Sequence, residues 1–293
     1  MQWAVQSGDG DRVSDIIAKM RALGAPSDAR IFLNGRRADP DEPVAHGDRV
    51  ELYPRRERRD SALVVVLAQR DGVLLALKPA GLPTETTKLG EDSLVSLLMT
   101  QLRSSSVHAA SRLDVAVSGV VVCTLGGDAA KRVELWRSRE QLERSYIAIA
   151  GGLLEAQGQW SVPLGRMRDR AGRHIASPHA RDTRAASTRY ERLACAERGG
   201  ASLLRLTPET GRMHQLRAHA AAAGAPLYGD RRYGGASSVV RDDGAVMSID
   251  RIALHALGVR SPVLEAVAPV PDALRGLWTA LGGEPVEWDQ LRL

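Results

Sequence analysis

A polar loop that runs directly into an apolar strand is the feature that most constrains this chain. Residues 111–122 read Ser-Arg-Leu-Asp-Val-Ala-Val-Ser-Gly-Val-Val-Val, and the β-branched run over 120–123 predicts a buried strand. We therefore expect Asp114 at the edge of a hydrophobic core. The dipeptide Ser118-Gly119 predicts a tight turn, because glycine accepts backbone angles that other residues resist. An aspartate that caps a turn or pairs with Arg112 would give the same local pattern, so other segments must decide its role.

Size and composition indicate a globular protein of about two domains. The chain has 293 residues, 44% of them hydrophobic, and its net charge of +5 favours a polyanionic partner without requiring one. Cys123 and Cys195 lie far apart and form no CxxC pair, so neither a disulfide framework nor a zinc site is predicted. There is no basic-then-apolar leader and no run of the about 18 apolar residues that a membrane span needs. We expect a soluble, cytoplasmic protein.

The amino-terminal part of the chain is predicted to contain one helix and two strands. Apolar residues recur at three- and four-residue spacing over 11–23, which predicts an amphipathic helix. A strand then runs into a hairpin turn at Asn34-Gly35, and residues 47–53 alternate like a second half-buried strand. Arg36 and Arg37 follow the turn and are the candidates for nucleic-acid contact in this unit. A protein-interaction or folding module would fit the same pattern.

A short charged segment, residues 55–61, lacks hydrophobic periodicity and is predicted to be a linker. It divides the chain into a small domain of residues 1–54 and a larger domain of residues 62–293. The larger domain opens with predicted strands over 63–67 and 73–77, joined by an Asp-Gly turn.

The loop after these strands reads Lys78-Pro-Ala-Gly-Leu-Pro83, and its two prolines and one glycine predict a rigid backbone. Lys78 is a candidate phosphate contact, although an ordinary salt bridge would explain it equally well. Helices are predicted over 93–103 and 127–139. They lie on either side of the aspartate loop in the sequence.

An alternating strand over 143–151 places Tyr146 among apolar neighbours, where a tyrosine is more often structural than functional. The segment 166–192 then holds eight arginines against three acidic residues. Such a charge run is usually a solvated face, but this one is also typical of an arm that closes on phosphates.

A polar turn and an alanine-rich helix occupy residues 209–224. His214 and Arg217 are three residues apart and so share one face near the helix start, where anions bind favourably. His214 and His219 are five apart, which argues against a shared metal. Residues 236–248 are predicted as a loop, followed by late core elements and a final helix within 269–281. The candidate site residues in the turn and helix are Arg212, His214, Gln215 and Arg217.

Five segments within residues 62–281 together resemble the RluA family of RNA pseudouridine synthases, in the family's order. Each segment alone is a modest signal, and all five in sequence are highly specific. They are the Lys-Pro-Ala-Gly-Leu-Pro loop (78–83), Arg-Leu-Asp-x-x-x-Ser-Gly (112–119), the Tyr146 strand ending in Gly, Thr-Gly-Arg-x-His-Gln-Leu-Arg-x-His (210–219) with the Gly-Asp and Tyr-Gly loop after it, and Leu-His-Ala (254–256). The amino-terminal helix, hairpin and strand also resemble the small alpha-L RNA-binding domain.

The resemblance implies an α+β fold. Its catalytic domain would have a mixed, mainly antiparallel central sheet flanked by helices, preceded by a small α/β RNA-binding domain. It implies isomerisation of uridine to pseudouridine in structured RNA, ribosomal RNA being favoured and transfer RNA an alternative. No cofactor and no metal are expected, and we expect a monomer.

By motif position, the resemblance makes Asp114 the nucleophile, Tyr146 the ring that packs on the target base and assists proton removal, and Arg217 the partner of the carboxylate. Arg112 would help fill the space left by the extracted nucleotide. These roles are physically coherent, since a desolvated carboxylate stays ionised only beside a cation. The further predicted RNA contacts are Lys78, Arg212, His214, Gln215, Arg36 and Arg37.

Two positions depart from the family pattern. Ser111 stands where the family usually has His, and Val117 where Thr is usual. They leave open a non-catalytic RNA-binding or ribosome-assembly factor that keeps the fold. A serine hydrolase using Ser118 with His214 or His255 is poorly supported, because the sequence lacks the Gly-x-Ser-x-Gly elbow.

Overall fold

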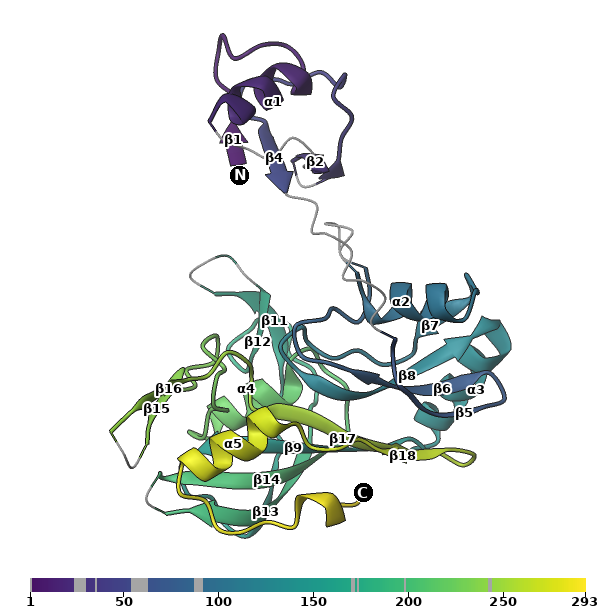
Figure 1. The fold of residues 1–293 in the computed structure, drawn as a ribbon, viewed down its shortest axis with the longest axis vertical. Helices are drawn as coiled ribbons and strands as arrows, with labels where there is room; N and C mark the ends of the chain where they lie inside the picture. The colour runs from purple at the N-terminus through teal and green to yellow at the C-terminus, as the bar shows by residue number, and fades with distance from the viewer. Residues whose placement is uncertain are drawn as a thin grey trace.

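The computed structural model contains a four-stranded sheet built by the amino-terminal residues and a ten-stranded sheet built by the rest of the chain (Figure 1). The predicted linker over 55–61 lies outside the described residues. The model describes residues 2–23, 30–34, 36–53, 63–86, 92–169, 172, 174–197, 199–241 and 244–293.

The small sheet is antiparallel and has the order β1-β4-β2-β3. Helix α1 (Val13–Ala22) packs on it and buries four residues at the predicted three- and four-residue spacing, so this helix is confirmed. Strand β1 was not predicted, because three residues are too short to show alternation. The predicted hairpin turn is only partly described, since Gly35 lies outside the described residues. The strands are β1 (Gln2–Ala4), β2 (Arg30–Leu33), β3 (Arg36–Arg37) and β4 (Arg49–Tyr53).

The large sheet has the order β10-β13-β14-β9-β17-β8-β6-β5, with β7 against β8 and β18 against β17. Among its described pairings, that of β17 with β8 is parallel and the others are antiparallel. The predicted mixed, mainly antiparallel α+β fold is therefore confirmed. The strands are β5 (Val66–Arg70), β6 (Val73–Lys78), β7 (Val107–Ala109), β8 (Ser118–Leu125), β9 (Glu143–Gly151), β10 (Gln157–Trp160), β13 (Thr188–Ala196), β14 (Ala201–Pro208), β17 (Leu254–Arg260) and β18 (Glu265–Val267).

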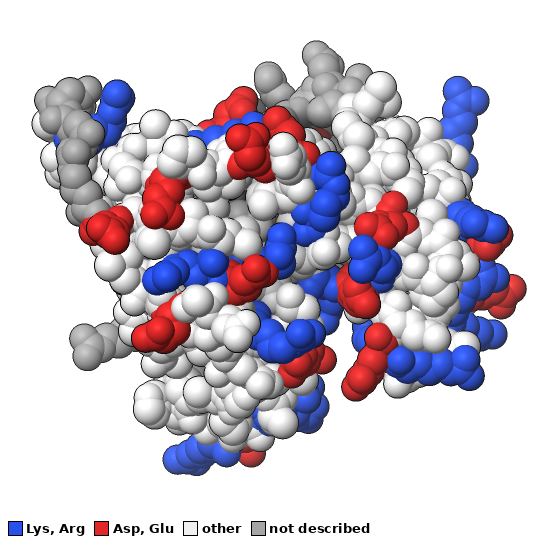
Figure 2. Space-filling model, turned by 90° about the horizontal axis from the view of Figure 1, so that it is seen from below, with Lys and Arg blue, Asp and Glu red and all other residues white. Residues whose placement is uncertain are grey.

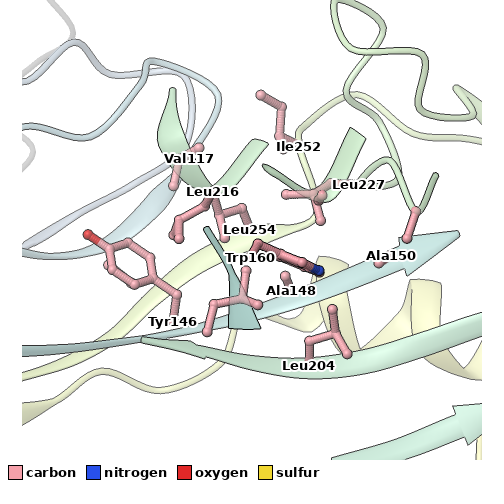
Figure 3. Packing of buried hydrophobic residues seen from close by; sticks show 14 residues of the cluster. Val117, Tyr146, Ala148, Ala150, Trp160, Leu204, Leu216, Leu227, Ile252 and Leu254 are labelled. Carbon is pink, nitrogen blue, oxygen red and sulfur yellow. The ribbon is translucent and has the colours of Figure 1, made fainter. Parts of the chain in front are cut away.

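Helices cover both faces of this sheet. Tyr146 and Ile147 are neighbours on β9 and point to opposite faces, as alternation along a strand requires. The face of Tyr146 is covered by α4 (Gln215–Ala222) through Leu216, in the apolar cluster of Figure 3. The face of Ile147 is covered by α5 (Asp272–Ala280). Helices α2 (Leu94–Gln101) and α3 (Gly126–Ser138) pack beside β8. No helix among the described residues is long and apolar enough to cross a membrane.

Three local predictions are wrong. Ser118-Gly119 is not a turn but the start of β8, and the turn lies just before it, where the Val117 N–H donates to the Asp114 carbonyl at 3.0 Å. Strand β5 begins at Val66, later than predicted. Residues 236–248 are not a plain loop, because they hold the hairpin of β15 (Ser238–Val240) and β16 (Val246–Ser248).

Candidate active site

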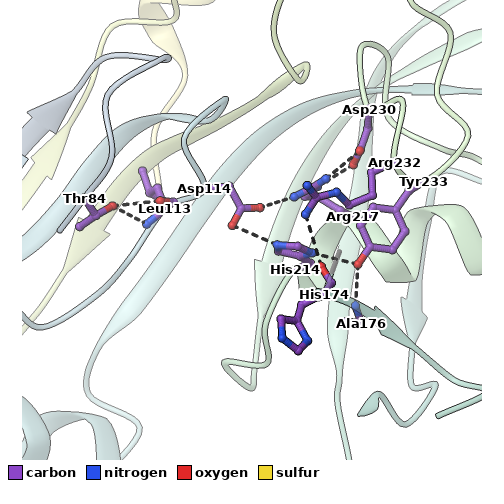
Figure 4. Close-up of polar contacts among 10 residues, drawn as sticks. All are labelled: Thr84, Leu113, Asp114, His174, Ala176, His214, Arg217, Asp230, Arg232 and Tyr233. Carbon is purple, nitrogen blue, oxygen red and sulfur yellow. Dashed lines mark hydrogen bonds and ion pairs between the residues drawn. The ribbon is translucent and has the colours of Figure 1, made fainter. Parts of the chain in front are cut away.

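The backbone around Asp114 is fixed by hydrogen bonds from a neighbouring loop. The Thr84 hydroxyl donates to the Leu113 carbonyl at 2.9 Å and accepts from the Leu113 N–H at 3.1 Å (Figure 4). The Gly81 N–H donates to the Val115 carbonyl at 2.7 Å. Both neighbours of Asp114 are therefore held, so its carboxylate starts from a defined position.

Lys78 is fully buried and acts on the same loops. Its ammonium donates to the carbonyls of Leu82 at 2.7 Å, Pro79 at 3.0 Å and Val115 at 3.4 Å. Burial lowers the pKa of Lys78 to about 8, and the charge of Asp114 opposes this shift. The structure corrects the prediction of a direct phosphate contact, because no side-chain surface of Lys78 is left for RNA.

Arg217 joins Asp114 to a second carboxylate, Asp230. Its Nη1 donates to Asp114 Oδ2 at 2.6 Å, while Nε and Nη2 donate to the two oxygens of Asp230 at 2.6 and 2.8 Å. Burial disfavours the charged guanidinium, but the two carboxylates outweigh it and raise the pKa of Arg217 above its usual value. The bidentate contact with Asp230 fixes the plane of the guanidinium and leaves one nitrogen for Asp114.

The second oxygen of Asp114 faces His214. His214 Nε2 lies 3.6 Å from Asp114 Oδ1, and His214 Nδ1 lies 3.0 Å from the Tyr233 hydroxyl. That hydroxyl accepts the Ala176 N–H at 2.7 Å, so its own proton is free to point at Nδ1. Burial lowers the pKa of His214, which favours the neutral ring. We assign the tautomer with the proton on Nε2, facing Asp114.

His214 has an unusual backbone conformation. Its φ is 51°, in the left-handed region, at the residue that caps the start of α4. A residue with a β-carbon adopts this conformation only at an energetic cost, and such residues are common at functional sites. This conformation places the ring beside Asp114 while Arg217, one turn further, reaches the same carboxylate.

Tyr146 is close enough to sense the charge of Asp114. It packs in one apolar cluster with Val117 and Leu216, which are the near neighbours in sequence of Asp114 and Arg217. Figure 3 shows its ring at the edge of this cluster with the hydroxyl pointing away from the other labelled residues. Burial raises the pKa of Tyr146, the charge of Arg144 opposes this shift, and the charge of Asp114 adds to it. The side chain is therefore a neutral phenol at neutral pH.

A cleft of about 620 Å³ opens over Asp114. His214, Arg217 and Asp230 line it together with a set of further arginines, so it is both polar and basic. The described residues contain no group of three or more His, Cys, Asp or Glu side chains that could hold a metal ion. The further arginines are Arg112, Arg231, Arg232 and Arg251.

The other predicted RNA contacts lie in different surroundings. Arg112 is exposed at the cleft and pairs with Glu85 at 3.0 Å, and Arg212 is exposed with its Nε on the Ala185 carbonyl. Gln215 is buried, and the structure corrects the prediction of RNA contact, because its amide bonds to Thr210, Thr188 and backbone groups.

The candidates in the small sheet are less fully described. Arg36 is exposed and pairs with Glu42, which raises the pKa of its guanidinium. Arg37 belongs to β3, but its side chain lies outside the described residues.

The arginine-rich segment forms a hairpin of β11 (Gly165–Arg168) and β12 (His174–Ser177), with β12 beside α4. Arg170 and Arg173 lie outside the described residues, and Arg168, Arg181 and Arg184 are exposed. On the face of the molecule in Figure 2, acidic and basic side chains are interspersed, so the net charge of +5 is not gathered in one patch there.

Ser118 and His255 do meet, as a serine hydrolase would require, but in the interior. The Ser118 hydroxyl lies 2.7 Å from His255 Nδ1 and accepts a hydrogen bond from Arg251 at 2.7 Å. Both Ser118 and His255 are buried and neither lines the cleft, so a substrate could not reach the hydroxyl. This cluster braces the parallel pairing of β8 with β17.

Sequence reasoning assigned no role to Asp230, Tyr233 or Arg251. Asp230 and Tyr233 lie within the Gly-Asp and Tyr-Gly loop, which contributed to the family resemblance but gave neither residue a role. A polar side chain next to a glycine in such a loop was the sequence signal that could have indicated a functional role for these two residues. Arg251 lies outside the predicted elements and carried no local signal.

The amino-acid sequence matches the family model described as RNA pseudouridylate synthase over residues 72–222. The chain belongs to this family. The synthase is 31% identical over 242 residues to the uncharacterized RNA pseudouridine synthase YhcT of Bacillus subtilis, covering 79% of this chain and 74% of that protein. It is 32% identical over 276 residues to the ribosomal large subunit pseudouridine synthase D of Xanthomonas campestris, covering 85% of this chain and 80% of that protein.

Solved structures agree at the level of the fold. The human RNA pseudouridylate synthase domain containing 1 aligns with a TM-score of 0.58 at 23% identity, over 77% of this chain and 97% of that one. The predicted resemblance to RluA-type RNA pseudouridine synthases is confirmed, and the protein is an RNA pseudouridine synthase.

Proposed function

We propose that the synthase isomerises specific uridines of structured RNA with Asp114 as the nucleophile. The contact of Asp114 Oδ2 with Arg217 at 2.6 Å is the observation that carries this proposal. The guanidinium holds one carboxylate oxygen, and the other faces the neutral His214 ring in an open cleft. A carboxylate fixed in this way is oriented before substrate arrives.

The chemistry needs one nucleophile and one proton transfer. Attack of Asp114 on either the ribose or the base leads to cleavage of the N1–C1′ bond. Uracil then rotates and a C5–C1′ bond forms. The bond between Asp114 and the ribose or base breaks, which regenerates the carboxylate, while C5 loses a proton and N1 gains one. A stacked uridine cannot reach the carboxylate, so the base must leave its helix at a cost of a few kcal/mol. Arg112 is exposed at the cleft, and its side chain would fill the space that the flipped base leaves in the RNA helix.

Tyr146 suits the packing of the flipped base better than it suits proton removal. Its raised pKa keeps the phenol protonated at neutral pH, so the hydroxyl can accept a proton only if it passes its own on. An aromatic ring beside the nucleophile can stack on uracil in either case.

We favour ribosomal RNA as the substrate and keep transfer RNA as the alternative. The alignment with the relative named for the large ribosomal subunit extends over 85% of the chain. We also propose that residues 1–54 form an alpha-L-like RNA-binding domain, joined through 55–61 to a catalytic domain of residues 62–293. Arg36 and Arg37 would then contact RNA, and the synthase would act as a cytoplasmic monomer.

Replacement of Asp114 by Asn tests the nucleophile, because the amide keeps the shape and loses the charge. We expect isomerisation to fall by about a thousandfold or more. A strain lacking the gene would be complemented with wild type or Asp114→Asn, and pseudouridine mapped across total RNA. Restoration of the missing site by the Asn variant at the wild-type rate would refute the assignment.

A further inference from the structure

The charged groups buried around the cleft do not balance. Lys78, Arg217 and Arg251 are cations in or beside the interior, whereas Asp114 and Asp230 are the carboxylates that face them. Three cations against two carboxylates leave one positive charge in excess, and the half-buried Arg232 of the same cleft adds another. The lowered pKa values of the nearby His214 and His255 keep those rings neutral, so they add no further charge at neutral pH.

Arg251 carries the part of this excess charge that burial disfavours. Arg217 has two carboxylate partners and Lys78 senses the charge of Asp114, but no carboxylate among the described residues forms an ion pair with Arg251. Burial lowers the pKa of Arg251 to about 10, with no acidic group opposing the shift. A half-buried cation without a counterion is costly, and such a group in a cleft is a candidate for a binding role.

Neutral groups hold Arg251 in place and leave part of its guanidinium available. Nη2 donates to the Ser118 hydroxyl at 2.7 Å and the Leu254 carbonyl at 3.1 Å, and Nε donates to the Ile252 carbonyl at 3.4 Å. The remaining nitrogen, Nη1, makes no hydrogen bond with the described residues. Because Arg251 lines the same cleft as Asp114, a fixed cationic donor is presented beside the nucleophile.

We propose that Arg251 binds a backbone phosphate of the RNA strand that enters the cleft. A phosphate carries the full negative charge that neutralises the excess, whereas a uracil carbonyl would leave it uncompensated. A guanidinium already fixed on one edge loses little entropy on binding. This inference rests on RNA being the substrate, but it concerns binding and does not depend on the role of Asp114.

The salt dependence of binding to a fluorescent single-stranded oligouridylate measures this contact directly. We expect Arg251→Gln to reduce the slope of log Kd against log salt by about 0.7, the effect of one phosphate contact on a single strand. Arg132→Gln removes the same charge from exposed α3, away from the cleft, and should leave the slope unchanged. A wild-type slope for Arg251→Gln would overturn the proposal.

Two further variants separate charge from packing. Ser118→Ala removes a hydroxyl that holds Arg251 and keeps the guanidinium, so its slope should remain that of the wild type. A loss of slope in Ser118→Ala equal to that in Arg251→Gln would show that the packing of the buried Ser118 cluster, and not the charge of Arg251, sets the salt dependence. If Arg251→Gln does not fold, Arg251→Lys should keep the slope and bind several-fold more weakly, because ammonium lacks the fork. Wild-type affinity in Arg251→Lys would contradict the proposal.

Discussion

The Tyr233 hydroxyl lies 3.0 Å from Nδ1 of His214, on the side of the imidazole opposite Asp114. The Tyr233 ring also lies 4.9 Å from the Arg217 guanidinium carbon, so one side chain contacts both groups that flank the nucleophile. Since the hydroxyl accepts the Ala176 N–H of β12, the arginine-rich hairpin is connected to the active site through these hydrogen bonds.

Tyr233→Phe removes this hydroxyl and keeps the ring against Arg217. We expect kcat to fall about tenfold with KM unchanged, because the loss of one positioning hydrogen bond is worth about 1 to 1.5 kcal/mol. Single-turnover isomerisation of the mapped RNA measures this fall in the rate. Tyr228→Phe is the matched control, since the Tyr228 hydroxyl bonds to the Gly199 carbonyl away from the site. Equal losses in the two variants would show that the effect is general packing.

Asp230→Asn should destabilise the synthase more than Asp114→Asn does. Asp230 is 1% exposed and binds two nitrogens of Arg217, so its loss leaves a buried guanidinium poorly compensated. We expect the free energy of unfolding to fall by about 3 kcal/mol, as when one partner of a buried ion pair is removed. The Asp114 side chain is 32% exposed, so water can solvate the guanidinium nitrogen that the Asn variant no longer neutralises. Urea unfolding of both variants compares them, and the reverse order would contradict the assigned anchoring role.

Tyr146→Phe and Tyr146→Leu separate the ring from the hydroxyl. If stacking dominates, Phe should bind RNA as the wild type does, whereas Leu should weaken binding by about 1 to 3 kcal/mol, the range for one base on an aromatic side chain. Slower isomerisation in the Phe variant at wild-type affinity would assign the hydroxyl to proton transfer. Equal RNA binding by Phe and Leu would exclude stacking by Tyr146.

The sequence predicted elements well where a pattern is local. The apolar run of β8 and the alternation of β9 located two central strands. Apolar spacing located α1, and alanine content located α4. Gly119 was predicted to make a turn, but its positive φ serves a different need. A β-carbon there would lie 2.2 Å from the Ala256 carbonyl oxygen, where β17 approaches β8. Close approach between strands distant in sequence has no local signature.

The site was predictable only in part for the same reason. Asp114 and Arg217 are 103 residues apart, and only the order of motifs suggested that they meet. Lys78 was predicted as a candidate phosphate contact and Gln215 as an RNA contact. In the structure the Lys78 ammonium bonds to carbonyls of its own loop, and the Gln215 amide bonds to the Ser187 carbonyl of another segment. The roles of Asp230 and Arg251 follow from contacts between segments of the folded chain. The spacing of residues in the sequence does not show such contacts.

The buried His255 should make the synthase sensitive to acid. Burial lowers the pKa of His255 from 6.5 to about 3, so between these values the unfolded chain binds a proton that the folded protein does not. Stability is therefore full above about pH 6.5 and declines as the pH falls toward 3.

His255→Asn, whose amide oxygen can still accept from Ser118, should flatten this decline in urea unfolding across the acid range. The exposed His108 changed to Asn serves as the control and should keep the wild-type slope. An unchanged decline in His255→Asn would place the acid sensitivity elsewhere, with His214 and His219 as the next candidates, because burial lowers the pKa of both.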